Sequence, residues 1–207
     1  MEVDQVIAEA DDGRYDRRDV ETIEGVMIHR CGVDLQMGVV LGYDALSVAA
    51  AFTGKAPQWE AVSKATGGQN AYSIMIGGDL GPAAFDGKVW QLLPLDEVGY
   101  HGRRFSSSYI GIGLIADPRY QAPSAAQRDS LIELLSAICP AYGWDPFKNI
   151  RGHGEVDGAH DGSKAPGKPA ACPGDMLPMN LVRADVADRV GSYSRLKLQD
   201  AGLILSR

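Results

Sequence analysis

Two stretches carry the predicted fold and site: Arg-Gly-His-Gly-Glu-Val at residues 151–156, and Ala-Cys-Pro-Gly-Asp at residues 171–175. They place an imidazole, His153, and a thiol, Cys172, in segments rich in glycine and punctuated by proline. Side chains in such segments can converge on one ion without following a helical or strand period. His153 and Cys172 are therefore candidate metal ligands.

A third candidate ligand lies far upstream, where the apolar run Val-Met-Ile ends in His29. Such a run is typical of a buried strand that presents a side chain at its end. On an extended chain Cys31 points to the same face as His29, so Cys31 is either a rival ligand or a small buried side chain beside the site. Two histidines and one cysteine would leave the fourth position of a zinc ion open for water, as catalytic zinc sites do.

The composition limits the class of protein. With 207 residues, 45% of them apolar and 23% charged, the chain is long enough for one well-buried core and short for two. A formal net charge of -7 argues against a nucleic-acid binder and gives no support to adhesion on anionic lipid. Three widely spaced cysteines are poor material for a disulfide framework.

No run of about 18 apolar residues occurs, and the first four residues, Met-Glu-Val-Asp, include two acidic side chains. We therefore expect no membrane insertion and no signal peptide. The expected site of synthesis is the cytoplasm, and a substrate outside it would require another route of export.

Hydrophobic periodicity predicts a mixed sheet with helices packed against it, an α/β (α+β) fold. Residues 1–22 are expected to form an arm or partial helix, residues 23–190 the domain, and residues 191–207 a C-terminal tail. The predicted strands cover residues 24–28, 71–76, 87–93 and 109–115, the second and third forming a hairpin; the predicted helices cover residues 43–52, 124–142 and 180–190.

Details of these elements carry further predictions. Ser124 and Gln127 form a capping box, and Gly143 lies just beyond the end of that helix. Cys139 continues its apolar row and is expected to pack in the core. Glycines at 111 and 113 in a strand predict that another group approaches the backbone closely there.

Several segments together resemble the type-2 N-acetylmuramoyl-L-alanine amidases, zinc enzymes related to peptidoglycan recognition proteins and common among phage endolysins. The resemblance spans roughly residues 22–190 in the family's order. It is carried by Ile-Glu-Gly-Val-Met-Ile-His-Arg (23–30), Ala-Tyr-Ser-Ile-Met-Ile (71–76), Gly-Tyr-His-Gly (99–102), Tyr-Ile-Gly-Ile-Gly-Leu (109–114), Arg-Gly-His-Gly-Glu-Val (151–156) and Ala-Cys-Pro-Gly (171–174).

The resemblance implies a Zn²⁺ ion held by His29, His153 and Cys172, and a groove for the glycan and stem peptide of peptidoglycan. The implied reaction is hydrolysis of the amide between the lactyl group of N-acetylmuramic acid and L-alanine. We expect a bacteriolytic, antimicrobial enzyme that acts on the cell wall after release, as an endolysin or a prophage or tail-associated enzyme does. A monomer is favoured. The alternatives are a non-catalytic peptidoglycan-binding module of this fold and a zinc peptidase acting on the stem peptide.

The resemblance also implies roles for other residues. Tyr72 matches a tyrosine that would donate to the developing oxyanion. His101 matches a histidine that lines the groove, and it is assigned to substrate contact or to support of the metal site. Glu155 is either a general base or a residue that orients a ligand.

Two departures from the family pattern concern catalysis. A lysine that often precedes the cysteine by two residues is here Ala170, so Lys168 or Lys164 would have to take its place. Gly113 stands where some relatives carry a glutamate base. Residues 157–168 resemble an insertion, and its His160 and Asp161 are expected to belong to a polar loop at the groove, with a metal role as the alternative.

Overall fold

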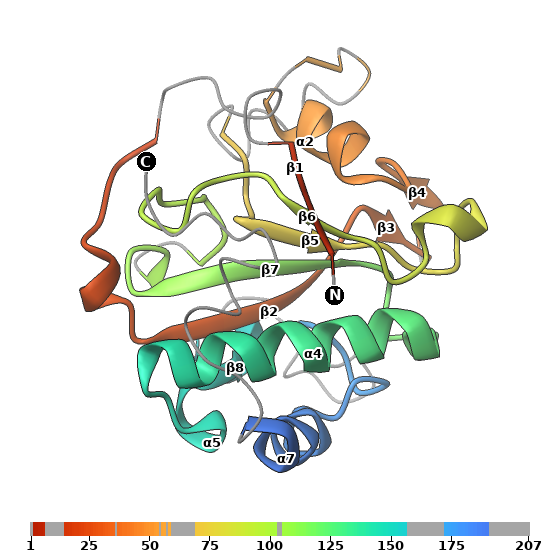
Figure 1. Cartoon of the computed structure of the whole chain (residues 1–207). Coiled ribbons are helices and arrows are strands. Elements are labelled where there is room, and N and C mark those ends of the chain that lie inside the picture. The colour runs from red at the N-terminus through yellow and green to blue at the C-terminus, as the bar shows by residue number, and fades with distance from the viewer. Residues whose placement is uncertain are drawn as a thin grey trace.

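The computed structural model describes residues 2–6, 15–35, 37–53, 55–56, 58, 69–102, 105–156 and 172–190. These residues form a six-stranded sheet in the order β1-β6-β5-β7-β2-β8 (Figure 1). β5 and β6 are antiparallel and the other neighbours are parallel, so the predicted mixed sheet is confirmed. The strands are β1 Val3–Gln5, β2 Gly25–Cys31, β5 Ile74–Ile76, β6 Val89–Gln91, β7 Tyr109–Ile115 and β8 Ile150–Gly152.

Helices cover both faces of this sheet. Figure 1 shows α4 and α7 on one side and α2 on the other. The α-helices are α2 Ala45–Thr53, α4 Ala125–Tyr142, α5 Pro146–Asn149, α6 His153–Val156 and α7 Met179–Arg189; the 3-10 helices are η1 Val20–Thr22 and η3 Ala83–Phe85; a separate two-stranded hairpin joins β3 Val33–Asp34 to β4 Val39–Val40. Among the described helices, none combines the length and apolar character needed to cross a membrane.

Helix α4 begins and ends where its sequence predicts. The Ser124 hydroxyl accepts a hydrogen bond from the backbone N–H of Gln127, and Gly143 ends the helix in the left-handed conformation with φ 67°. Cys139 is fully buried in the core beneath this helix, as predicted. The helix therefore supplies one rigid side of the core.

The alternation of side chains along the central strands gives the two faces of the sheet different compositions. In β2, Val26 and Ile28 belong to the core cluster that includes α4 and α7, whereas Cys31 belongs to the cluster that includes α2. In β7, Ile112 faces α4 and the glycines on either side of it face the opposite way. His29 therefore lies on the α2 face.

The structure differs from the sequence prediction in several short elements. The N-terminal arm was expected to be irregular or helical, but Val3–Gln5 form β1, which pairs with β6 and buries Val3. β2 extends through Cys31, because β7 pairs with it along its whole length. The strand β8 and the hairpin β3–β4 were not predicted, since runs of two or three residues give no periodic signal.

Candidate metal centre

Three side chains from separate segments converge on the α2 face of the sheet. One ligand atom from each of His29, His153 and Cys172 lies within 4.8 Å of the others. The Cys172 sulfur is 3.9 Å from Nδ1 of His29, and the ring centroids of the two histidines are 4.5 Å apart. Two imidazoles and a thiol at such separations form a donor set suited to one zinc ion.

Backbone pairing brings the first two side chains together. His29 lies in β2, opposite Gly113 of β7, and β8 pairs with the other edge of β2. His153 follows β8 directly as the first residue of α6, so it projects beside His29. The sequence predicted no regular structure at His153, and the short strand and helix around it are what fix its position.

The cysteine segment is tied to the same strands by its backbone. The carbonyl of Cys172 accepts a hydrogen bond from the N–H of Gly154 at 2.8 Å, and the Cys172 sulfur accepts one from the N–H of Arg30 at 3.4 Å. Gly174 has φ 131°, and a Cβ there would lie 2.4 Å from the carbonyl carbon of Pro118. Only glycine fits this contact, which holds the segment against the residues after β7.

Burial determines the charge state of His29. Its side chain is 2% exposed, and burial, with smaller contributions from His101 and His153, moves its pKa well below the usual value of 6.5. A neutral imidazole keeps the lone pair that a metal ligand requires. His29 is therefore ready to act as a ligand at neutral pH.

Tyr72 lies beside the three candidate ligands. Its ring centroid is 5.1 Å from that of His29 and 5.8 Å from that of Phe52 in α2. Burial raises the pKa of Tyr72 well above 10, with the nearby thiols Cys31 and Cys172 adding to the effect. The hydroxyl therefore keeps its proton and can donate it in a hydrogen bond.

The glycines of β7 allow side chains to lie directly on the sheet, as predicted. A Cβ at Gly113 would be 2.8 Å from the Cys31 sulfur and 2.8 Å from the Tyr72 ring. The space that a glutamate would occupy at this position is therefore filled by these two side chains. Cys31 itself is buried and lies outside the group of three, and burial raises the pKa of its thiol, which favours its role as a packed side chain.

His101 packs on the other glycine, where a Cβ at Gly111 would lie 2.6 Å from its Cγ. Its Nδ1 is 3.2 Å from Nε2 of His29, and its Nε2 is 3.0 Å from the carbonyl oxygen of Tyr109. Burial, with the charge of Arg18 as a smaller contribution, lowers the pKa of His101 to about 3. Both ring nitrogens face protein atoms, so the geometry favours support of the metal site over substrate contact.

The Glu155 carboxylate is bound by protein groups of β8 and α7. Its Oε2 accepts a hydrogen bond from the N–H of Gly152 at 2.8 Å and forms an ion pair with Arg183 of α7. Arg183 also donates to the carbonyl of Ile150. These contacts tie β8, α6 and α7 together, which favours a structural role for Glu155 over that of a general base.

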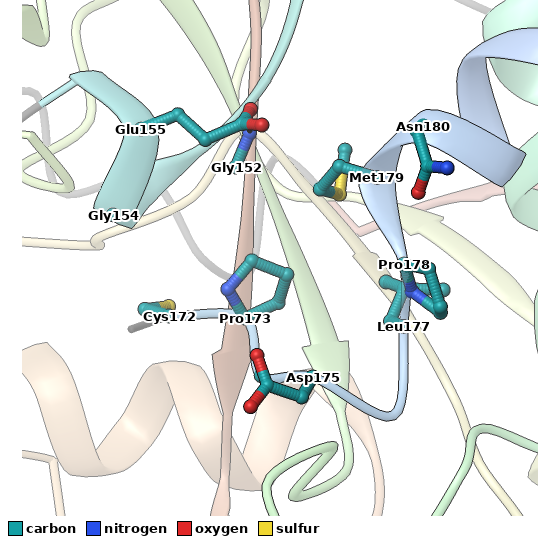
Figure 2. A pocket seen from close by; sticks show the side chains of 11 residues that line it. Gly152, Gly154, Glu155, Cys172, Pro173, Asp175, Leu177, Pro178, Met179 and Asn180 are labelled. Atoms are coloured by element: carbon teal, nitrogen blue, oxygen red, sulfur yellow. Dashed lines mark hydrogen bonds between the residues drawn. The ribbon is translucent and has the colours of Figure 1, made fainter. Parts of the chain in front are cut away.

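Two clefts lie at the site, one lined in part by Cys172 and the other in part by Tyr72. The first cleft has a volume of ≈ 380 Å³, and Figure 2 shows residues that line it, among them Cys172, Glu155 and Asp175. The second cleft, of ≈ 260 Å³, has an apolar lining that includes Tyr72 and Phe52.

Two lysines that the sequence offers for catalysis are not among the described residues, and two arginines at the site have no sequence signal. Lys164 and Lys168, together with residues 157–171 that include the proposed insertion, lie outside the described residues. Arg183 and Arg18 were missed, because an arginine that binds backbone carbonyls far along the chain has no local sequence signal.

The sequence model of one family, described as N-acetylmuramoyl-L-alanine amidase, matches residues 19–175, more than half of the chain. No curated protein sequence matches.

Several solved structures share the fold. A selenomethionine derivative of AmpD is 19% identical, with a TM-score of 0.62, and the match covers 89% of this chain and 94% of that one. The Ph2119 endolysin from the Thermus scotoductus MAT2119 bacteriophage Ph2119 is 18% identical, with a TM-score of 0.59 and coverage of 89% and 98%. The Drosophila peptidoglycan recognition protein SD is 19% identical, with a TM-score of 0.58 and coverage of 88% and 94%.

Proposed function

The chain belongs to the N-acetylmuramoyl-L-alanine amidase family, and we propose that it is a zinc enzyme that hydrolyses the amide between the lactyl group of N-acetylmuramic acid and L-alanine. The observation that carries this proposal is the convergence of His29, His153 and Cys172, whose ligand atoms lie within 4.8 Å of one another. A module that only binds peptidoglycan has no need for this complete donor set. The set therefore favours the enzyme.

The donor chemistry fits zinc. One thiolate and two neutral imidazoles satisfy three of its four usual positions and leave about one net positive charge. When bound, zinc supplies Lewis acidity towards water and towards an amide carbonyl. The three residues would hold the ion. The backbone contacts of Cys172 and the strand pairing of His29 fix the positions of these two side chains.

Tyr72 is the proposed donor to the oxygen of the amide as negative charge develops on it. Its proton is retained because burial raises its pKa, and its ring packs against those of His29 and Phe52. A preorganised donor of this kind is worth more in a partly buried site than in water. Lys168 is kept as a second candidate donor, on the strength of its place in the sequence.

Digestion of purified peptidoglycan tests the function. The expected products are free L-alanine amino termini and intact glycan strands, detected by amino-group labelling and mass spectrometry, with activity lost on chelation and restored by zinc. Cleavage between amino acids would identify a peptidase instead. Tight binding to the wall without any product, in zinc-loaded protein, would identify a non-catalytic module.

The biological setting is proposed from the same family relation. A lytic enzyme of the endolysin or tail-associated type would meet its substrate, the cell wall, after release from the cell that makes it. Turbidity loss of whole cells and of isolated walls, compared at equal enzyme concentration, measures this activity. Lysis of isolated walls alone would show that the enzyme requires another component to reach its substrate.

A further inference from the structure

A line of hydrogen bonds runs from a partly buried arginine, Arg18, to the candidate metal centre. The carbonyl oxygen of Tyr109 accepts from Nη1 of Arg18 at 2.7 Å and lies 3.0 Å from Nε2 of His101. On the far side of the same ring, Nδ1 of His101 lies 3.2 Å from Nε2 of His29. The remaining nitrogen of His29, Nδ1, is the one that faces Cys172.

When the buried His101 ring is neutral, this carbonyl acceptor sets the direction of both hydrogen bonds that the ring makes. A carbonyl oxygen can only accept, so Nε2 of His101 must carry a proton and donate it. In a neutral imidazole the other nitrogen then has a lone pair, and Nδ1 of His101 accepts the proton on Nε2 of His29. Nδ1 of His29 is consequently left without a proton and with its lone pair directed at the site.

We propose that His101 is a positioning residue, which holds His29 in the tautomer that presents Nδ1 to the metal. This inference rests on the proposed zinc site and adds to it a residue that contacts neither metal nor substrate. Zinc-bound histidines commonly donate their second ring proton to a carboxylate, a carbonyl or water. Here an imidazole takes that place, and the Tyr109 carbonyl fixes its tautomer in turn.

The surroundings of His101 favour this role. The ring lies on the backbone of Gly111, which leaves it no room to rotate towards the sheet. Arg18 donates to the carbonyls of Leu95 and Ser106 as well as Tyr109, so it holds both ends of the segment that carries His101. Arg18 precedes the first residue of the family match, so the line of bonds extends beyond the matched segment.

The hydrogen bond between His29 and His101 can be observed directly by NMR, because the chain has only four histidines whose signals must be assigned. In zinc-free protein labelled with ¹⁵N-histidine, we expect protonated Nε2 and unprotonated Nδ1 on His29, and a ¹⁵N–¹⁵N coupling across the hydrogen bond to His101. Protonation of Nδ1 on His29 in the wild-type protein would overturn the inference.

Variants of His101 test whether the residue acts through its hydrogen bond to His29 or only by filling space. His101→Phe should abolish the coupling, add a population of His29 protonated on Nδ1, and weaken zinc binding about 10- to 100-fold in competition with a chromophoric chelator. His101→Asn keeps an acceptor oxygen near the position of Nδ1 and should recover most of that affinity. The matched control is Ser106→Ala, which removes the hydrogen bond that the Ser106 hydroxyl accepts from the N–H of Gly102 in the same segment. It should change neither the coupling nor the zinc affinity.

A second variant serves if His101→Phe does not fold. Gly111→Ala keeps both imidazoles and forces the His101 ring away from the strand, so the coupling and the zinc affinity should both fall. Unchanged zinc affinity and an unchanged His29 tautomer in His101→Phe or Gly111→Ala would refute the positioning role alone. Failure of the wild-type protein to bind zinc would refute the proposed function, whereas the zinc-free tautomer would still test the positioning role.

Discussion

The two faces of the central sheet are built from the same strands and have opposite characters. On the α4 side the strands present branched apolar side chains, among them Ile28 and Ile112, and these are fully buried. On the α2 side the neighbouring positions of the same strands are His29 and Gly113. One face therefore supplies most of the apolar core, and the other holds buried polar and titratable groups at fixed separations.

The difference between the two faces shows how this fold can hold buried polar groups and remain stable. Burying an imidazole is unfavourable unless it is hydrogen-bonded, and His29 is bonded through His101. The glycines of β7 have no side chains of their own to pack, and this leaves room for His101, Cys31 and Tyr72 to lie on the sheet. We expect the apolar face to compensate for this loss, so changes on the two faces should affect different measurements.

The largest effect is expected from removing the thiol. Cys172→Ala should abolish amide hydrolysis and weaken zinc binding by roughly a hundredfold or more, since even an outer partner of a zinc ligand contributes 10- to 100-fold. Zinc content after gel filtration and product release from peptidoglycan measure the two effects. The control is Cys139→Ala, which removes a thiol on the α4 face and should keep both zinc binding and amide hydrolysis. Lytic activity in the Cys172 variant would refute its assignment as a ligand.

The next largest effect concerns the proposed oxyanion donor. Tyr72→Phe should lower kcat about 10²- to 10³-fold, the usual loss for one such donor, with zinc content unchanged. Steady-state kinetics on a soluble muropeptide give kcat and KM separately. Tyr142→Phe removes a hydroxyl on the α4 side and should leave kcat as it was. If the Tyr72 variant lost its zinc, Tyr72 would be a support of the metal centre instead.

Adjacent residues of β7 sharpen the contrast between the faces. Ile112→Ala should lower the free energy of unfolding by about 2–5 kcal/mol through the cavity it leaves, with zinc affinity unchanged. Gly113→Ala should instead displace Cys31 or Tyr72 and lower kcat by roughly tenfold or more. Urea unfolding and kinetics on both variants provide the test. Loss of kcat in folded Ile112→Ala would show that the faces are coupled.

The smallest effect is expected at Glu155. Glu155→Gln keeps an oxygen for the N–H of Gly152 and loses only the charge opposite Arg183, a partly exposed pair worth about 0–1 kcal/mol. The expected kcat is within about threefold of the wild-type value. A general base would cost about 10²- to 10⁴-fold, so a loss of that size would restore the catalytic role.

The predictable part of the molecule is the part encoded in local pattern. The capping residues of α4, the strand Tyr109–Ile115 and the close approach at Gly111 and Gly113 all follow from period and residue type, and the structure confirms them. The three candidate ligands could be named because histidine and cysteine are few.

The rest depends on contacts between distant segments. β8 is three residues long and exists because β2 offers it a partner edge. His101 and His29 are 72 residues apart in the chain, and no periodicity links them. The fit of Gly174 against Pro118 and the ion pair of Glu155 with Arg183 likewise appear only once the sheet has assembled.

X-ray absorption at the zinc edge of the wild-type protein tests the central claim most directly. The claim predicts one equivalent of zinc, with one sulfur at about 2.3 Å and two imidazole nitrogens at about 2.0–2.1 Å, and with the sulfur absent in Cys172→Ala. A shell of nitrogen and oxygen alone in the wild-type protein, or no bound zinc after loading, would contradict it.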